Sequence, residues 1–325
     1  MSLVEPTVVL IVSFVAFGLL VGILFGFFGM GGSFFVTPAL LVLGHSATTA
    51  VGTGLAFVFG TSLVAAVTHR DLGQIDYRIG ALFVLGMSLG IEVGRRTLQR
   101  LSALGVADVL VSSIYVLLLA GVGYYMLSDY LHGGAARYDP ARSGLTRFVR
   151  DATPPPTITV SGGATVSVWV VLAVAFGIGC LAGGLGVGGG FLVLPTLVYG
   201  FGMAETVAVG TDVFQIASSS AFGTLQYARQ GSIHVSMVAY LLAGGIPGAR
   251  IGARLTGTVD ERVVKGYFGV VLLLGSVAVA SKVVSHAYGV ELLHDLSVVL
   301  LFGSAFVVSV LVLWQGFVSR ERPTE

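Results

Sequence analysis

The sequence predicts an all-α integral membrane protein built from two homologous halves, and three observations lead to that prediction. Of its 325 residues, 55% are hydrophobic and 10% are charged, and the mean hydropathy is +0.95. A soluble domain carries about 25% charged residues, so this chain has too few charges to cover a water-exposed surface. Nine apolar stretches are long enough to cross a bilayer, and a glycine-rich motif occurs twice.

The same composition excludes several classes of protein. Seventeen basic and 16 acidic residues give a net charge of +1, so there is no large field to attract a nucleic acid. The single cysteine, Cys180, permits neither an intrachain disulfide nor a cysteine metal cluster. Soluble enzymes, nucleic-acid-binding proteins and disulfide-stabilised secreted domains are therefore excluded.

Each membrane span needs about 20 consecutive apolar residues. The stretches that meet this requirement are 7–28, 47–68, 76–95, 106–128, 165–187, 204–228, 234–254, 263–282 and 293–316. The first four are assigned to one half and the next four to the other. The last is predicted to be an extra C-terminal helix.

Two shorter apolar segments, 33–43 and 190–201, are predicted to be broken helices. Each follows a glycine cluster and contains a proline, Pro38 or Pro195, that interrupts regular helix. Short segments of this kind enter the membrane and turn back when protein or a wet cavity surrounds them. If they cross fully instead, the crossings rise from nine to eleven and the orientation must be worked out again.

These elements divide the chain into four parts. The first membrane repeat covers 1–128, an exposed polar linker 129–164, the second membrane repeat 165–282, and the extra helix with a short tail 283–325. With nine crossings, the excess of lysine and arginine falls on the side of the C-terminus. The positive-inside rule then predicts a cytoplasmic C-terminus, with the N-terminus and the linker outside.

The repeat is visible as ordered matches at a nearly constant offset. Residues 26–34 match 183–191 at an offset of 157, and residues 50–53 match 208–211 at an offset of 158. Duplicated halves with interrupted helices indicate the substrate site of a secondary transporter. Four crossings per half would make the repeats parallel, and an odd number would make them inverted; the sequence leaves both open.

The two glycine loops are the first candidate binding elements. Their residues are Gly29, Gly31, Gly32 and Ser33 in the first half, and Gly186, Gly188, Gly189 and Gly190 in the second. Glycine permits positive φ, and the start of the following half-helix offers unpaired N–H groups to an anion. We expect the loops to hold a small anion between them; the alternative is that they are tight turns that only help helices to pack.

A second candidate element follows each half-helix. Gly52-Thr53 and Gly210-Thr211 would add hydroxyl donors to the pocket, and Gln215 extends the polar stripe of the second half. Asp212 lies about 12 Å into its span at 1.5 Å per residue. A carboxylate at that depth is costly and is a candidate proton or cation carrier; the alternative is a carboxylate satisfied by neighbouring donors.

Other features have structural interpretations. Glycines four residues apart, such as Gly18, Gly22 and Gly26, let helices approach closely, and Glu92 is expected to pair with Arg95 and Arg96 on its own helix. The histidines are scattered, so neither a metal site nor any cofactor is predicted. No convergent catalytic residues are found, so the chain is not expected to be an enzyme.

The paired motifs resemble those of the TauE/SafE family of sulfite exporters, also called the toluene-sulfonate uptake permease family. The resemblance rests on Gly29-x-Gly31-Gly32, Pro38 and Gly52-Thr53, with their counterparts Gly186-x-Gly188-Gly189-Gly190, Pro195 and Gly210-Thr211. It implies a duplicated permease of the prokaryotic plasma membrane. It also implies transport of sulfite, sulfonates, thiosulfate or related organosulfur anions.

The expected function is therefore a secondary transporter of a small anion, with Asp212 as the coupling residue. The expected partners are that anion, the lipid bilayer and, as an open option, further copies of the chain; no nucleic acid is expected. An uncoupled anion channel of the same fold is the first alternative. A membrane-embedded enzyme and a scaffold or sensor subunit are the others.

Overall fold

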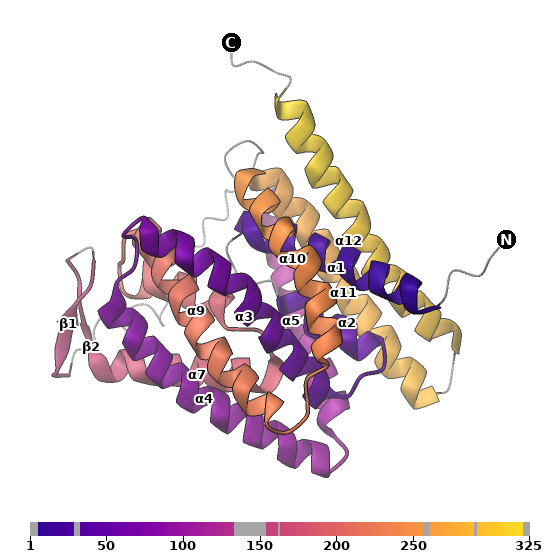
Figure 1. Cartoon of the computed structure of the whole chain (residues 1–325), viewed down its shortest axis with the longest axis horizontal. Helices are drawn as coiled ribbons and strands as arrows, with labels where there is room; N and C mark the ends of the chain where they lie inside the picture. The colour runs from indigo at the N-terminus through magenta and orange to yellow at the C-terminus, as the bar shows by residue number, and fades with distance from the viewer. Residues whose placement is uncertain are drawn as a thin grey trace.

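A computed structural model describes residues 6–28, 33–132, 154–161, 163–255, 261–288 and 291–320, and these residues form a helical bundle (Figure 1). The first half contains α1 (Pro6–Phe28), α2 (Ser33–Val42), α3 (Ala47–Asp71), α4 (Tyr77–Ala103) and α5 (Ala107–Leu131). The second contains α7 (Val168–Leu185), α8 (Gly190–Pro195), the π-helical turn η2 (Thr196–Gly200), α9 (Glu205–Ala228), α10 (Val235–Leu255) and α11 (Glu261–Tyr288). The additional helix is α12 (Glu291–Arg320).

Every predicted span contains a helix that covers most of it, although the span 165–187 begins in strand β2 and only 168–185 of it is helical. The two short helices lie where broken helices are expected. Six helices, namely α3, α4, α5, α7, α10 and α11, are long and apolar enough to cross a membrane. Within the described part of α1 and α12, the apolar stretches are shorter, 11–26 and 295–308. Helix α9 has 24 residues but carries a polar face. The all-α polytopic prediction is confirmed.

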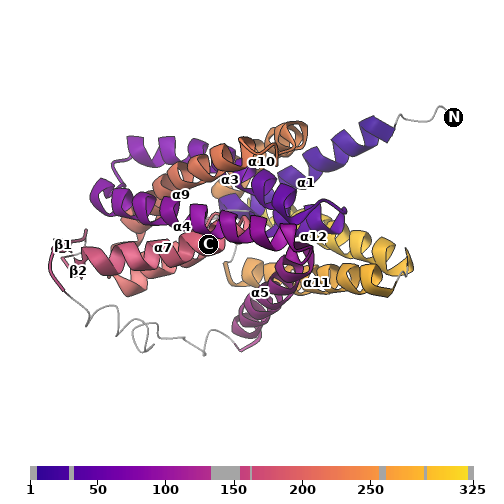
Figure 2. The same ribbon diagram turned by 90° about the horizontal axis from the view of Figure 1, so that it is seen from below.

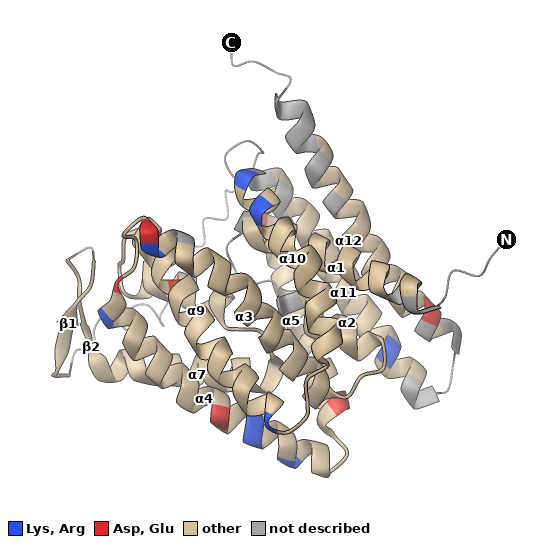
Figure 3. Ribbon diagram, in the orientation of Figure 1, with Lys and Arg blue, Asp and Glu red and all other residues tan. Residues whose placement is uncertain are grey.

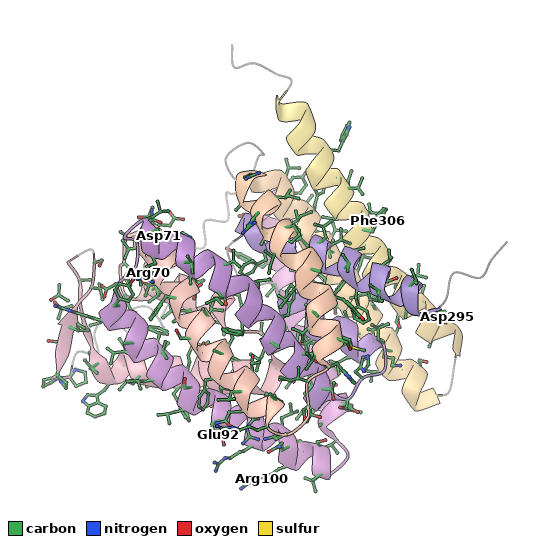
Figure 4. All side chains as sticks on the ribbon, in the orientation of Figure 1. Arg70, Asp71, Glu92, Arg100, Asp295 and Phe306 are labelled. Atoms are coloured by element: carbon green, nitrogen blue, oxygen red, sulfur yellow. The ribbon has the colours of Figure 1, made fainter. Side chains whose placement is uncertain are left out.

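The surface of the bundle is that of a membrane protein. Large apolar side chains are exposed on its outside, among them Leu117, Tyr124 and Val299, which are 74%, 70% and 67% exposed. The described charged residues gather near helix ends, and the middles of the helices lack them almost entirely (Figure 3). Phe306, labelled in Figure 4, likewise faces outward from α12.

The region predicted as a linker contains regular structure that its sequence did not indicate. Helix α5 continues to Leu131, and a hairpin of β1 (Thr157–Thr159) and β2 (Thr165–Ser167) pairs Ile158 with Val166. Strands of three residues are too short to show an alternating pattern. The linker arginines Arg137, Arg142, Arg147 and Arg150 lie outside the described residues.

The glycine ladders bring helix backbones into contact, as predicted. A Cβ built on Gly18, Gly22 or Gly26 of α1 would lie 2.0–2.3 Å from a carbonyl oxygen of α10. Gly90 and Gly94 of α4 approach the carbonyls of α7 to the same degree. Both views show α4 running beside α7 (Figures 1 and 2).

These contacts also fix the directions of the helices. Along α1 and α10 the contact numbers rise together, from Gly18 with Leu241 to Gly26 with Ala249, so the two helices are parallel. Helix α3 is parallel to them too, because Gly52 near its start lies against Ser232 in the loop that leads into α10, and Gly60 lies against Leu242 further along both helices. By the same criterion α4, α7 and α9 are parallel to one another, whereas α3 and α9 are antiparallel. Elements that correspond at the 157–158 offset therefore run in opposite directions.

Helix α2 returns the chain through the bundle. Its Phe35 packs on Phe268 of α11, with ring centroids 5.9 Å apart, whereas Leu41 and Gly44 line a pocket with Lys282. Phe268 and Lys282 are separated by about 21 Å of helix. Since α1 and α3 are parallel, and α7 and α9 are parallel as well, the segment between each pair must cross back; these two returns correspond to the eleven-crossing alternative.

Two faces of the bundle are named here after residues labelled in Figure 4. The Arg70 face contains the end of α3, with Arg70 and Asp71, and the Arg100 face contains the C-terminal part of α4, from Glu92 to Arg100. Helix α1 starts on the Arg100 face, whereas α5 ends on the Arg70 face. This differs from the prediction that the N-terminus and the linker share one side, because that prediction did not count the return through α2.

Candidate functional site

Buried polar side chains concentrate on the antiparallel pair α3 and α9 in the middle of the bundle. Those that are at most 1% exposed are Thr53, Thr61 and Ser62 on α3, and Thr211, Asp212, Gln215, Ser219 and Ser220 on α9. On a helix, spacings of three and four residues place side chains on one face. The polar face of α9 is thus turned inward, away from lipid.

Asp212 begins a chain of hydrogen bonds along α9. Gln215 Nε2 donates to Asp212 Oδ1 at 2.9 Å, and Ser219 Oγ donates to Gln215 Oε1 at 3.4 Å. The second carboxylate oxygen, Oδ2, is buried and has no hydrogen-bond partner in the described part of the chain. A buried polar atom left unpaired is costly and therefore marks a functional candidate.

The second glycine loop requires its glycines for two reasons. Gly186, Gly188 and Gly189 have φ values of 76°, 69° and 85°, a region that other residues rarely adopt. A Cβ on Gly186 would also lie 2.9 Å from the backbone of Val51 on α3. This loop therefore fits tightly against the start of α3.

Two tyrosines anchor that loop by binding the end of α7. Tyr115 of α5 donates its hydroxyl to Leu185 O at 2.5 Å, and Tyr227 of α9 donates to Gly183 O at 2.7 Å. Carbonyls in the last turn of a helix lack intrahelical partners, so the tyrosines satisfy them. The sequence patterns single out neither tyrosine. The one available signal is that each is a tyrosine within an apolar span, where its hydroxyl needs a hydrogen-bond partner.

Thr37 of α2 is another polar residue that sequence reasoning missed. It is fully buried, and its Oγ1 has no hydrogen-bond partner among the described residues. A Cβ on Gly54 would lie 2.5 Å from this oxygen, and one on Gly186 would lie 2.8 Å from it. Thr37 thus brings a hydroxyl to the glycine loop and to the position that corresponds to Asp212.

The first glycine loop can be compared only in part. Gly29, Gly31 and Gly32 lie outside the described residues, and Ser33 is described only as the first residue of α2. Pro38 lies inside α2, which continues through it, whereas Pro195 lies where α8 changes into the π-helical turn η2. Gly190 is the first residue of α8.

Both predicted Gly-Thr pairs contact a loop of the opposite half. Thr53 Oγ1 accepts a hydrogen bond from His234 N at 3.3 Å, and Thr211 Oγ1 accepts one from Asp76 N at 2.9 Å. A Cβ on the preceding glycine would overlap a carbonyl oxygen of the same loop: Ser232 O lies 2.4 Å from that of Gly52, and Gln74 O lies 2.1 Å from that of Gly210.

The structure places the predicted residues at different depths. Gly186–Gly190 and Gly52-Thr53 lie toward the Arg100 face, where Tyr227 contacts Gly52. Thr211 and Asp212 lie toward the Arg70 face, about 22–24 Å along α9 from Tyr227. Gln215 and Ser219 extend from Asp212 toward the middle. The described candidates therefore form an axis through the bundle.

At the Arg100 face, side chains of several elements meet near the candidate axis. The Glu92 carboxylate accepts from Arg95 Nε at 2.8 Å and from Arg96 Nε at 2.6 Å, so the predicted ion pair is confirmed. His45, in the loop before α3, contacts His234 with ring centroids 5.2 Å apart. Burial, and to a lesser degree the nearby His234, lower the pKa of His45 below its usual value of 6.5.

An inward polar axis, a glycine loop before the interrupted helix α8 and an apolar exterior define the class of membrane transporters. The described residues contain no group of three or more metal-ligating side chains that could hold a metal ion. A family model described as sulfite exporter TauE/SafE matches residues 14–279. The chain belongs to this family.

Curated relatives bear the same general description. The probable membrane transporter protein YunE of Bacillus subtilis is 26% identical over 268 residues, which cover 80% of this chain and 93% of the relative. A probable membrane transporter protein of Xylella fastidiosa strain Temecula1 is 26% identical over 260 residues, covering 79% and 89%. No solved structure matches the chain.

Proposed function

We propose that this membrane transporter moves a small sulfur-containing anion, such as sulfite, a sulfonate or thiosulfate, by secondary transport. The family description supports an oxyanion substrate of this kind. Glycine backbone amides and buried hydroxyls are suitable ligands for an oxyanion because they donate hydrogen bonds without adding a fixed charge. In this proposal the substrate-binding residues are those of the two glycine loops and Gln215, with the hydroxyl of Thr37 added to them. Gly52-Thr53 and Gly210-Thr211 lie at the two ends of the substrate path.

The observation that carries the proposal is the burial of Asp212 and the incomplete hydrogen bonding of its carboxylate. Its side chain is fully buried, one carboxylate oxygen accepts from Gln215, and the other has no partner in the described structure. An isolated charge at this depth is expensive, so binding of a proton there is favourable. We therefore assign Asp212 the coupling role, in which a proton is bound and released during each transport cycle.

The directions of the helices support alternating access. Inverted repeats place two similar half-structures around a central site, and rocking of one against the other opens either face.

The distribution of basic residues favours one orientation of the protein in the membrane. Among the residues that the structure describes, the Arg70 face has seven basic residues, Arg70, Arg78, Arg250, Arg254, Arg262, Lys265 and Arg320. The Arg100 face has five, Arg95, Arg96, Arg100, Arg229 and Lys282.

By the positive-inside rule, the Arg70 face is cytoplasmic in this proposal. The N-terminus is then outside and the C-terminus inside, in the prokaryotic plasma membrane. The linker, which connects two elements at the Arg70 face, is then cytoplasmic.

Proteoliposomes containing the purified chain test the function directly. We expect uptake of radiolabelled sulfite or a sulfonate to depend on an imposed pH gradient. Asp212→Asn should abolish that dependence while the protein still folds, because the amide keeps the shape but cannot exchange the proton. Asp71→Asn, which changes an exposed carboxylate at the end of α3, is the matched control and should leave flux unchanged.

Two outcomes would decide against parts of this proposal. Wild-type flux that neither saturates nor supports counterflow would favour the uncoupled anion channel instead. Flux in Asp212→Asn with an unchanged pH dependence would exclude the coupling role, provided that the variant elutes as the wild type does in size-exclusion chromatography.

A further inference from the structure

The two Gly-Thr pairs make the same contact at opposite ends of one helix pair. Thr53 corresponds to Thr211 at the repeat offset of 158, and Asp76 corresponds to His234 at the same offset. The hydrogen bond from His234 N to Thr53 is therefore the equivalent of the hydrogen bond from Asp76 N to Thr211. The close approaches of Gly52 to Ser232 and of Gly210 to Gln74 map in the same way. These four contacts, two at each end of the helix pair, form the same structural motif at two places in the molecule.

Each copy of this motif joins the start of one central helix to a loop of the other half. The Arg100-face clasp consists of Gly52 and Thr53 of α3 with Ser232 and His234. The Arg70-face clasp consists of Gly210 and Thr211 of α9 with Gln74 and Asp76. Because α3 and α9 are antiparallel, the clasps close the two ends of the polar axis that lies between them.

We propose that these two clasps are the gates of the transporter and that Thr53 and Thr211 act as positioning residues that hold each gate shut. This proposal rests on the proposed alternating-access function. Both clasps are closed in the structure, so the structure corresponds to an occluded state. Opening one clasp would separate the ends of α3 and α9 at one face and leave the other face sealed.

The packing around the clasps favours movement at these points. Along α1 with α10, and along α4 with α7, backbones touch at successive glycines, so these pairs can slide little without overlap. A clasp contains a single glycine approach of this kind and one hydrogen bond from a backbone N–H to a hydroxyl, which contributes little net free energy. A rigid-body motion will therefore separate the clasps before it separates the glycine-packed helices.

The two gates are not equally reinforced. In the Arg70-face clasp, Asp76 Oδ1 accepts from two N–H groups that begin α4, and its Oδ2 accepts from Ser161 Oγ of the hairpin at 2.9 Å. In the Arg100-face clasp, His234 has a ring contact with His45. The Arg70-face gate is thus tied by more hydrogen bonds, and the Arg100-face gate is the one that opens more readily.

Cysteine accessibility measures each gate without any substrate. Ser220 and Ser62 are equivalent at the 158 offset, both are fully buried, and each lies about 10 Å inside its clasp along the helix. In a Cys180→Ala background, Ser220→Cys reports on the Arg100-face gate and Ser62→Cys on the Arg70-face gate. Lipid nanodiscs expose both faces to a charged maleimide, so the orientation in the membrane does not affect the measurement.

Removing one hydroxyl should open one gate. We expect Thr53→Val to raise the labelling rate of the cysteine at position 220 about three- to tenfold, as expected for loss of one hydrogen bond, and to leave position 62 within about twofold. Thr211→Val should do the converse. Thr53→Ser and Thr211→Ser keep the acceptor and should restore wild-type rates, which a general loss of packing would not allow.

The outcomes separate the two proposals. Equal acceleration at both positions, or no change at either, would overturn the gate assignment. Selective acceleration in a chain that moves no anion in proteoliposomes would overturn the proposed substrate and retain the gates. Anion flux in proteoliposomes, together with labelling rates that the threonine substitutions do not change, would overturn the gates and retain the proposed substrate.

Discussion

Several buried side chains in this bundle form hydrogen bonds with backbone groups that have no partner in a helix or strand. Tyr115 and Tyr227 reach from α5 and α9 to the last carbonyls of α7, and Thr53 and Thr211 receive N–H groups from loops. In a bilayer, water cannot satisfy such groups, so buried side chains must do so. The isolated polar residues in apolar spans therefore hold the interrupted helices in place.

His45 contributes a pH dependence to the stability of the molecule. Because the pKa of His45 is lowered in the folded state, the folded chain binds fewer protons there than the unfolded chain does. The stability is thus complete above pH 6.5 and falls as the pH decreases through the lowered pKa. Asp108 and Lys282 line the same pocket and His234 contacts the ring.

We expect His45→Gln to weaken this pH dependence, because glutamine does not titrate. Thermal unfolding in nanodiscs, followed at pH values from above to below 6.5, measures it. The wild-type unfolding temperature should decrease toward acid more steeply than that of the variant. Parallel curves for the two proteins would show that another group causes the acid sensitivity.

At the scale of helices, glycine position decides how closely two elements can pack. In α7, Gly179 lies against the backbone of α4, where a Cβ would be 2.5 Å from Met87 O, whereas no atom lies within 4 Å of a Cβ on Gly177. Both residues belong to the same helix and are two positions apart. Comparing substitutions at these two positions therefore distinguishes the packing role of glycine from the effect of its low helix propensity.

Gly179→Ala should therefore destabilise the protein by about 1–3 kcal/mol, the usual cost of overpacking. Gly177→Ala should be neutral or stabilising by up to about 1 kcal/mol, because it removes conformational freedom from the unfolded chain. Unfolding in mixed micelles with increasing denaturing detergent provides the comparison. Equal effects of the two substitutions would contradict close α4–α7 packing.

For the whole molecule, the inverted relation of the halves has a direct topological consequence. Asp71 and Arg229 are exposed equivalents at the 158 offset, at the ends of α3 and α9. Inverted halves place them on opposite sides of the membrane, and parallel halves would place them on the same side.

We expect Asp71→Cys and Arg229→Cys, each in the Cys180→Ala background, to react with an impermeant maleimide from opposite sides. The measurement compares intact cells with inside-out vesicles. The orientation proposed from the basic residues further requires the cysteine at position 71 to be labelled only in inside-out vesicles. Labelling of both positions from one side would contradict the helix directions found here.

The sequence by itself determined the class of protein, its helices and its family. Low charge, high hydropathy and spans of about 20 residues are properties of local composition, and the paired motifs at Gly186 and Gly210 are recognisable without coordinates. The glycine ladders could also be interpreted, because a spacing of four residues has a packing meaning in any helix.

Only the tertiary structure decided how these elements are combined. The return through α2, the opposite directions of the halves and the β-hairpin depend on contacts between residues far apart in the chain, which no local pattern encodes. The sequence suggested Thr53 and Thr211 as substrate ligands, but their hydroxyls accept N–H groups from residues 181 and 135 positions away. Thr37, Tyr115 and Tyr227 became recognisable only when folding brought them to Gly186 and the end of α7.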